Sequence, residues 1–439
     1  MVQFRYESVF SLGEFGLKKA SFEAQISKLP KFLELIRSRG QGFIDLPDDG
    51  AMVREIEEYA AKVRGKFDHV VVLGIGGSAL GVTCLMDALK HPYWNELPKQ
   101  KRKQPQLFVL DNVDPAQMAQ LDDLLNYKKT LFVVITKSGT TPETMSQYYF
   151  YRAKMEKAAG AIIAKKHFVF VTDATRGVLR GIAEKDGIPC FTIPANVGGR
   201  FSVLSPVGLL PAALLGISVK ALMAGARAQR AQFLDSRYVR NLSFQLATIQ
   251  YLLQKERDIS MTVMMPYASA LASLADWYRQ LLAESIGKAV TRDGKKVNVG
   301  LTPIKALGVT DQHSQVQLYN EGPRDKFTMF IEVESLFGKN LTIPSAKIAS
   351  PEMAYLKGVT FQELMSVEKR ATARALHEYG RPTATISISK ITEESLGELF
   401  MLLEGSIAFL GEYYNIDAYD QPGVELAKVY TKKMLLEDR

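Results

Sequence analysis

The feature that most constrains the fold of this chain is an alternation of short apolar segments with longer helical ones. Segments rich in valine and phenylalanine recur between residues 69 and 193. They are HVVVLGI (69–75), QLFVLDN (106–112), TLFVVIT (130–136), HFVFVTD (167–173) and PCFTI (189–193). Strands that are apolar on both faces are typical of a parallel sheet covered by helices on both sides. The pattern therefore predicts an α/β fold.

A second alternating set follows, and it predicts a second α/β domain of similar kind. Its strands are expected at residues 258–267, 326–334 and 383–390, and its helices at 268–284, at 393–411 and from Gly423 onward. Between the two sets, the apolar segment 202–218 is interrupted by Pro206 and Pro211, which indicates a buried helical connection. We expect a helical segment over residues 1–50, a first domain over 51–198, a second domain over 199–415 and a C-terminal helix within 416–439.

Charge limits the classes of partner. The chain has 439 residues, of which 47% are hydrophobic, and a formal net charge of +8. A basic balance suits nucleic acid, an anionic membrane or a small anionic substrate. The basic residues are spread along the chain, and their densest run, KQKRK (99–103), is expected to be a solvated loop between two prolines. This spread does not by itself decide between the three, and we expect a small anionic substrate, with no nucleic-acid and no membrane partner.

Cysteine, histidine and apolar content point to a cytoplasmic protein without a metal. Cys84 and Cys190 are the only cysteines and are interpreted as reduced core thiols, because two distant cysteines make no disulfide framework. The N-terminus lacks the apolar stretch of a signal peptide, and no uninterrupted apolar run reaches the ~18–20 residues of a membrane span. The histidines form no HxxH or HxxxH pair, so no metal site is expected.

The segment VVLGIGGSALG (71–81) joins a predicted strand to a glycine-rich turn. Residues 74–79 fit the G-x-G-x-x-A form of the dinucleotide-binding fingerprint, but that fingerprint also needs an acidic residue about 20 positions later, at the end of a strand. The corresponding region, YWNELPKQ, does not read as a strand. A P-loop is excluded, because no G-x-x-x-x-G-K-[ST] occurs. The turn still favours an anion, since glycines expose N–H groups at a helix start and Ser78 adds a hydroxyl. A tight turn without a ligand is the alternative.

A second loop, VVITKSGTTPET (133–144), favours a phosphate monoester. It again follows an apolar strand, and Thr141 and Pro142 suit the N-cap and the first position of a helix. Lys137 and the hydroxyls of Thr136, Ser138, Thr140 and Thr141 would meet at the carboxyl end of this strand. Short donors of this kind surround a compact phosphate better than they follow a pyrophosphate. The alternative is an ordinary capped turn.

Four downstream motifs together resemble the glucose-6-phosphate isomerase family, in its shorter, prokaryotic-type form. They are GGRFSVLSPVG (198–208), AESIGK (283–288), TDQHSQVQ (310–317) and YDQPGVELAK (419–428). The resemblance covers nearly the whole chain. It implies two sugar-isomerase (SIS) type α/β sandwich domains with mainly parallel sheets, plus helical N- and C-terminal segments. It also implies an isomerase that interconverts the 6-phosphates of glucose and fructose without a cofactor or a metal.

The resemblance gives each matching residue an expected role. The hexose 6-phosphate would be bound by Gly77, Ser78, Thr136, Lys137, Ser138, Thr141, Gln280 and Gln421. Glu284 matches the base that moves a proton between C1 and C2 through a cis-enediol, and Arg200 matches the cation that stabilises the enediolate. His313 and Lys428 match the pair that opens the sugar ring.

The same resemblance implies a homodimer with shared active sites, in which His313 of one subunit reaches the site of the other. Two alternatives remain at the level of sequence. One is an isomerase that also accepts mannose 6-phosphate, and the other is a non-catalytic sugar-phosphate-sensing SIS protein. Such a sensor should lack the base and the ring-opening residues and carry a DNA-binding segment. Here Glu284, His313 and Lys428 are present, and no helix-turn-helix signature is found.

Overall fold

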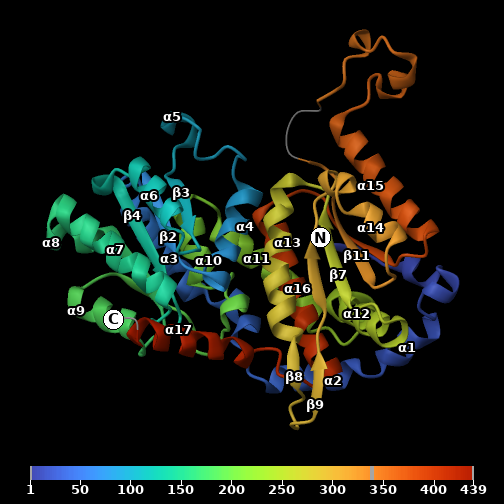
Figure 1. The fold of residues 1–439 in the computed structure, drawn as a ribbon, viewed down its shortest axis with the longest axis horizontal. Coiled ribbons are helices and arrows are strands. Elements are labelled where there is room, and N and C mark those ends of the chain that lie inside the picture. Colours follow the sequence, from blue (N-terminus) through green and yellow to red (C-terminus); the bar gives the residue numbers. More distant parts are fainter. Residues whose placement is uncertain (1, 337–340, 438–439) are drawn as a thin grey trace.

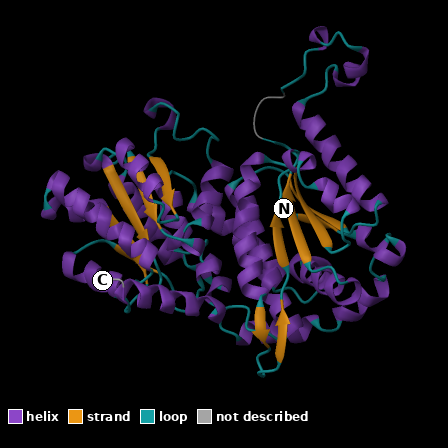
Figure 2. Ribbon diagram, in the orientation of Figure 1, coloured by secondary structure: helices purple, strands orange, loops and turns teal. Residues whose placement is uncertain are grey.

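Two five-stranded sheets, each flanked by helices, form the framework of the protein (Figure 1). The computed structural model describes residues 2–336 and 341–437. Figure 2 shows the two sheets side by side, with helices between them and around them. The alternation of strands and helices predicted from the sequence is confirmed in both halves of the chain.

The first sheet is parallel throughout, with the strand order β3–β2–β4–β5–β6. Its strands are β2 (His69–Leu73), β3 (Gln106–Leu110), β4 (Thr130–Ile135), β5 (Phe168–Thr172) and β6 (Cys190–Thr192). Every residue of β4 and β5 is buried, as expected for central strands covered on both faces. The helices of this half are α3 (Gly50–Val63), α4 (Leu80–Leu89), α5 (Lys99–Arg102), α6 (Pro115–Leu124), α7 (Pro142–Ala159), α8 (Ala161–Ala164) and α9 (Val178–Asp186).

The second sheet has the strand order β1–β12–β11–β7–β10. Its parallel strands are β7 (Met261–Pro266), β10 (Thr302–Lys305), β11 (Lys326–Val333) and β12 (Thr383–Ile388). The N-terminal segment, expected to be helical, also supplies a strand: β1 (Gln3–Arg5) pairs antiparallel with β12. A separate hairpin is formed by β8 (Lys288–Val290) and β9 (Lys296–Val299). Neither β1, β10 nor the hairpin was predicted.

The parallel strands of the two sheets follow the same order, with the antiparallel strand β1 added at one edge of the second. In each set, the strand that comes first in the chain lies between the second and the third: β2 between β3 and β4, and β7 between β10 and β11. The chain therefore extends the sheet first on one side of that strand and then on the other. In open parallel sheets, ligand sites form beyond the carboxyl ends of the strands at such a reversal. In the first sheet, the loops at this point are the two that the sequence associates with a phosphate.

Long helices pack between the two sheets and join them into one core. α16 (Glu393–Tyr414) is buried from Leu396 to Tyr414 and packs along α11 (Val219–Phe233) and α12 (Leu242–Arg257). α13 (Ala272–Ile286) contacts β7 and β10 of the second sheet, and it also contacts α4 and the turn η5 (Gly76–Ser78) beside the first. The predicted buried connection contains α10 (Pro206–Leu214), which is almost entirely buried. Helix α13 therefore packs against the second sheet and at the same time places its side chains next to the loops of the first sheet.

Two expectations need correction at the level of single residues. Segment 99–103 is not wholly a solvated loop, because Lys99–Arg102 form α5 and Arg102 is buried. Its guanidinium donates to the carbonyl oxygens of Leu97 and Gln104 at 2.7 and 2.9 Å. Cys84 is buried as expected, whereas Cys190 is only partly buried. Both thiols are free, and burial raises the pKa of each.

The C-terminal helix α17 (Glu425–Glu437) runs along the surface beside the first sheet, where Figure 1 shows it in red. All of its residues are exposed, and Leu426, Tyr430 and Met434 are each more than half exposed. Exposed apolar side chains gathered on one helix are typical of a surface that another molecule covers.

The remaining helices lie at the periphery. They are α1 (Lys19–Ile26), α2 (Leu29–Ser38), α14 (Val316–Glu321) and α15 (Phe361–Glu378). No helix within residues 2–336 and 341–437 combines the length and the apolar character needed to cross a membrane.

Candidate active site

A cavity of about 680 Å³ opens at the carboxyl edge of the first sheet, where the strand order reverses. Its walls come from the loops after β2, β4 and β5, from the turn η8 (Gly199–Phe201), from α13 and from the segment around α17. The residues predicted for the site that line it are Gly77, Ser78, Thr136, Lys137, Ser138, Thr141, Arg200, Gln280, Glu284, Gln421 and Lys428. His313 is the one predicted site residue that the cavity does not include.

The glycines of the first loop let it touch two other parts of the cavity wall. Gly76 has a φ of +59°, and a Cβ atom there would lie 2.8 Å from Nε2 of Gln280. A Cβ atom on Gly77 would lie 2.2 Å from the carbonyl oxygen of Gly199. A Cβ atom on Gly77 would push the turn away from the backbone of η8, whereas one on Gly76 would displace the Gln280 side chain and strain the backbone at this positive φ. The glycines therefore help to assemble the cavity, besides exposing N–H groups toward it.

The loop between β4 and α7 presents a cluster of hydroxyls. Thr136 Oγ1 lies 2.7 Å from Thr141 Oγ1, and Ser138 Oγ lies 3.3 Å from the same atom. Pro142 is the first residue of α7, as predicted. Thr141 is the N-cap residue, but its hydroxyl makes no capping hydrogen bond and faces the other hydroxyls instead. This end of the cavity can offer several short donors to an anion at a helix start.

Lys137 joins the same loop to the segment before η8. Its ammonium donates to the carbonyl oxygens of Ala195 and Val197 at 2.7 and 2.8 Å. An ammonium group has three N–H donors, so one more remains for a ligand. Burial lowers the pKa of Lys137. The lysine thus fixes one wall of the cavity and adds a cation next to the hydroxyl cluster.

Glu284 and Gln280 lie one turn apart on α13 and both face the cavity. The Gln280 amide donates to Oε1 of Glu284 at 3.2 Å, and Nη1 of Arg200 lies 3.6 Å from Oε2. The Glu284 side chain is nevertheless 35% exposed. A carboxylate held on one side and open on the other is suited to proton transfer with a bound molecule.

Arg200 is almost fully buried and is held by several acceptors at once. Nε donates to Oγ of Ser285 and Nη1 donates to Oε1 of Gln421, both at 2.7 Å. Nη2 donates to the carbonyl oxygens of Ala418 and Asp420 at 2.6 and 3.0 Å. Burial lowers the pKa of the guanidinium. These contacts fix a positive charge beside Glu284 and tie α13 to the segment before α17.

Gln421 and Lys428 enter the cavity from the C-terminal part of the chain. Arg200 holds the Gln421 side chain, whereas Lys428 is more than half exposed and donates to Glu425 at 2.7 Å. An exposed ion pair of this kind contributes little free energy, about 0–1 kcal/mol. Lys428 can therefore turn toward a ligand at low cost.

His313 lies apart from this cavity. It ends the turn η11 (Thr310–His313), which precedes α14 on the side of the second sheet, and its side chain is exposed. The structure of a single chain thus brings the predicted base and the predicted lysine together, but not the predicted histidine.

Three charged residues of the lining were not predicted: Glu143, Asp173 and Arg176. Asp173 follows β5 and accepts the N–H groups of Thr175 and Arg176 at 2.9 and 3.1 Å. These hydrogen bonds lower the pKa of Asp173. Its place at the carboxyl end of a strand was a usable signal. Glu143 lies in the first turn of α7, directly after the hydroxyl-rich loop, whereas Arg176 enters the cavity through the shape of its loop, which leaves no pattern in the sequence.

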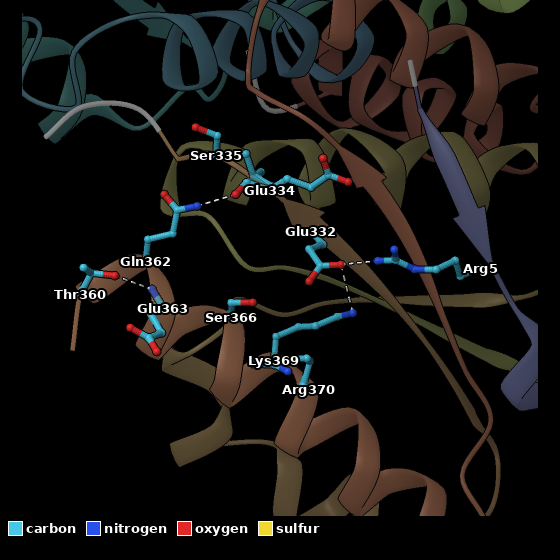
Figure 3. Close-up of a pocket in the computed structure, with 11 residues that line it drawn as sticks. Arg5, Glu332, Glu334, Ser335, Thr360, Gln362, Glu363, Ser366, Lys369 and Arg370 are labelled. Carbon is cyan, nitrogen blue, oxygen red and sulfur yellow. Dashed lines mark hydrogen bonds and ion pairs between the residues drawn. The ribbon is translucent and has the colours of Figure 1, made fainter. Parts of the chain in front are cut away.

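A second and larger cavity, of about 920 Å³, lies at the matching edge of the second sheet (Figure 3). Its central charges are paired within the protein: Glu332 accepts from Arg5, and Nζ of Lys369 lies 3.5 Å from the same carboxylate oxygen. Lys369 also donates to Thr385 at 2.9 Å. Because its central cations face a carboxylate, and because it includes none of the predicted site residues, this cavity is a weaker candidate for an anionic substrate.

The cavity of the first sheet has two chemically distinct ends. One end, with the hydroxyl cluster and Lys137, suits a phosphate dianion. The other end, with Glu284 beside Arg200, suits removal of a proton and stabilisation of the oxyanion that results. Within the described part of the chain, no three His, Cys, Asp or Glu side chains are grouped so that they could hold a metal ion.

Sequence comparison finds relatives over almost the full length of the chain. A model of the phosphoglucose isomerase family matches residues 53–439. A glucose-6-phosphate isomerase from Carboxydothermus hydrogenoformans is 45% identical over 424 residues, covering 95% of this chain and 91% of the relative. A glucose-6-phosphate isomerase from Rubrobacter xylanophilus is 40% identical over 432 residues, covering 98% of this chain and 97% of the relative.

Solved structures resemble the whole molecule. A hypothetical protein from Thermus thermophilus superposes with a TM-score of 0.87 at 34% identity, covering 99% of this chain and 100% of that one. A glucose-6-phosphate isomerase from Chlamydia trachomatis superposes with a TM-score of 0.83 over 99% of this chain and 88% of that one. Its identity is only 20%, so this likeness bears on the fold alone.

Proposed function

The chain belongs to the phosphoglucose isomerase family, and we propose that the cavity at the carboxyl edge of the first sheet is where it interconverts glucose 6-phosphate and fructose 6-phosphate. The family, the isomerase activity and the α/β fold of the sugar-isomerase type, all predicted from the sequence, are confirmed by these relatives. The observation that supports the location is the meeting, in one cavity, of an anion-binding end with a carboxylate beside a buried guanidinium.

We propose that the phosphate occupies the end formed by the two strand-to-helix loops. The hydroxyls of Ser138, Thr136 and Thr141 would donate to phosphate oxygens, together with Ser78 and the N–H groups at the start of α7. Lys137 would add the one donor that its carbonyl contacts leave over. Gly77, Gln280 and Gln421 would contact the sugar.

At the other end, we propose that Glu284 is the base. It takes the proton from C2 of the open-chain aldose, and the electrons of that C–H bond form the C1–C2 double bond of a cis-enediolate. The same carboxyl group returns the proton to C1 while a proton passes from O2 to O1, which leaves the carbonyl at C2. Hydrogen moves within one molecule, so the reaction is redox-neutral overall. Arg200 stabilises the negative oxygen of the intermediate.

Ring opening needs a proton at the ring oxygen and removal of one from the C1 hydroxyl. We propose that Lys428 and His313 perform these transfers, and that the protein is a homodimer in which His313 of each subunit completes the cavity of the other. Two observations support this arrangement. His313 is exposed and lies outside the cavity of its own chain, and the exposed apolar residues of α17 offer a surface for a second subunit.

Two further proposals concern the whole chain. We propose that its units are the helical segment 1–50, the domains 51–198 and 199–415, and the C-terminal segment 416–439, which carries Lys428. We also propose a cytoplasmic location, which the free thiols of Cys84 and Cys190 support.

The test is a coupled assay of the purified chain with fructose 6-phosphate, in which glucose 6-phosphate is read by a dehydrogenase, with mannose 6-phosphate supplied in a parallel reaction. We expect turnover of fructose 6-phosphate. Comparable turnover of mannose 6-phosphate would identify the dual-specificity alternative. A folded protein that binds 6-phosphogluconate but shows no turnover would identify a sensing protein instead.

A further inference from the structure

Lys288 lies outside the lining of the cavity, yet its ammonium joins two segments that shape it. Nζ donates to the carbonyl oxygen of Glu284 at 2.6 Å and to that of Asp420 at 3.0 Å. The Asp420 carboxylate is the third neighbour, with Oδ1 at 3.6 Å. The Lys288 side chain is only 7% exposed. Three acceptors therefore face the three donors of a buried ammonium group.

The first contact acts on the end of the helix that carries Glu284. The last four carbonyl groups of an α-helix have no partner within the helix. α13 ends at Ile286, so the carbonyl of Glu284 is one of these four, and the Lys288 ammonium supplies its donor. The backbone from which the Glu284 side chain extends is thereby held by a buried cation.

The second contact acts on the segment between α16 and α17. The carbonyl oxygen of Asp420 accepts from Lys288 and from Nη2 of Arg200, each at 3.0 Å. The next residue is Gln421, whose side chain Arg200 also holds. Two buried cations from different parts of the chain thus fix one carbonyl group immediately before the segment enters the cavity.

We infer that Lys288 is a positioning residue, which sets the distance between Glu284 and the sugar contact Gln421. The inference rests on the proposed role of Glu284 as the base. Without the ammonium, the Glu284 carbonyl loses the donor that caps it, and the Asp420 carbonyl keeps only Arg200. A displacement of about 1 Å in a catalytic group is enough to cost about 10²-fold in rate.

The principal test compares Lys288→Met with Lys326→Met. Lys326 is the matched control because its side chain is equally buried at 7% and is also paired with an aspartate, Asp325, but at the start of β11 and away from the cavity. In Lys288→Met we expect kcat to fall by about 10- to 100-fold, with KM and 6-phosphogluconate affinity within about threefold of the wild type. In Lys326→Met we expect kcat per folded molecule to stay unchanged.

The kinetic isotope effect of deuterium at C2 of glucose 6-phosphate distinguishes a misplaced base from a smaller amount of folded protein. If Lys288 positions the base, proton transfer becomes more rate-limiting in Lys288→Met, and the isotope effect on kcat rises above the wild-type value. A smaller folded fraction would lower the measured rate and leave the isotope effect unchanged. An unchanged isotope effect, a kcat within twofold of wild type, or an equal loss in Lys326→Met would overturn the inference.

A second variant keeps the test decisive where the methionine variant folds poorly. Lys288→Cys, treated with 2-bromoethylamine, carries a thioether analogue of lysine at the same position. We expect this amine to restore most of kcat and iodoacetamide, which adds a neutral amide, to restore none. Wild-type protein is treated in parallel, because Cys84 and Cys190 are also present. No gain from the amine would contradict the inference, whereas a wild-type chain without turnover would contradict the proposed function itself.

Discussion

At the scale of single residues, the basic carboxylate of Glu284 can be removed by substitution with glutamine, which hardly changes the volume of the side chain. Its Oε1 accepts from Gln280, and the side chain remains partly open to the cavity. An amide in its place keeps the shape and the contact area of the carboxylate but has no basic oxygen.

We expect Glu284→Gln to lower isomerisation by at least about 10²–10⁴-fold, the usual share of general acid–base catalysis. The affinity for 6-phosphogluconate should change little, because the hydroxyl-rich end of the cavity is untouched. Exchange of the substrate's C2 hydrogen with solvent, followed by NMR, should disappear together with turnover. Exchange at the wild-type rate in this variant would assign the base role to another residue.

For the hydroxyl cluster we expect an effect on binding and not on catalysis, because its side chains hold the substrate and take no part in the reaction. Hydrogen bonds to a charged group are worth about 1.5–3 kcal/mol each, so Ser138→Ala and Thr141→Ala should each weaken substrate binding by about 10- to 100-fold. The effect should appear in KM more than in kcat. Ser146→Ala is the matched control, since Ser146 lies exposed on α7 and does not belong to the lining of the cavity. Tight binding of NAD by calorimetry, with none for 6-phosphogluconate, would contradict this reading of the loop.

Sequence motifs predict which residues belong to the site better than they predict which residues contact one another. The sequence predicts the residues of the cavity that lie in recognisable segments, such as Ser78 and Glu284. Lys288 belongs to the motif AESIGK, yet its contact with Asp420 joins positions 132 residues apart and has no counterpart in local sequence. Arg176 was missed for the same reason, because only the folded loop brings it to the cavity.

At the scale of elements, most strands that the sequence reveals are the longer ones, although β6, with three residues, was also predicted. The predicted strands of five or more residues, such as β4 and β11, carry runs of apolar side chains long enough to distinguish from helices. β1 has three residues and β10 has four, and each lies at an edge of the second sheet. Segments that short show no period, so pairing with a neighbour, and not their own composition, makes them strands.

Helix α16 contains an element-scale feature with a measurable pH dependence. Glu404 is fully buried in this helix, and neither of its carboxylate oxygens has a hydrogen-bond partner within the described residues. Burial raises the pKa of Glu404 well above its usual value. The folded state therefore keeps a proton that the unfolded state releases above about pH 4.3, the ordinary pKa of glutamate. The free energy of unfolding from this group falls as the pH rises from there to the folded-state pKa.

We expect Glu404→Gln to raise Tm more at pH 8 than at pH 5, because the amide does not titrate and so avoids this loss. Calorimetry of wild type and variant at the two pH values measures the difference. Glu34→Gln is the control, since Glu34 lies exposed on α2 and should shift Tm equally, and little, at both. Equal shifts for Glu404→Gln at pH 5 and pH 8 would show that its ionisation does not contribute to stability.

At the scale of the whole molecule, the single chain leaves two features without a counterpart. Within the described residues, the apolar side chains of α17 are left exposed, and His313 faces solvent on the side of the second sheet. The proposed two-fold pair would account for both at once, with each His313 completing the other chain's cavity.

Mixing two inactive variants tests this arrangement. His313→Ala and Glu284→Gln, allowed to exchange subunits, should regain activity, because one site of each mixed dimer carries both lesions and the other carries neither. With random exchange about half of the dimers are mixed, and each has one intact site of two, so recovery should approach roughly a quarter of wild type. Mass spectrometry confirms the exchange. Activity that stays at background after confirmed exchange would place His313 in the site of its own chain.

The pairing of β1 with β12 has a consequence for how the molecule is made. Gln3 pairs with Ser387, so β1 finds its partner only after residue 387 has been synthesised. The first sheet has no such dependence, because its strands follow one another between residues 69 and 192. The ribosome therefore releases a complete first sheet long before the second one can close. Contacts so distant in sequence are slow to form, which makes closure of the second sheet the expected late event in folding.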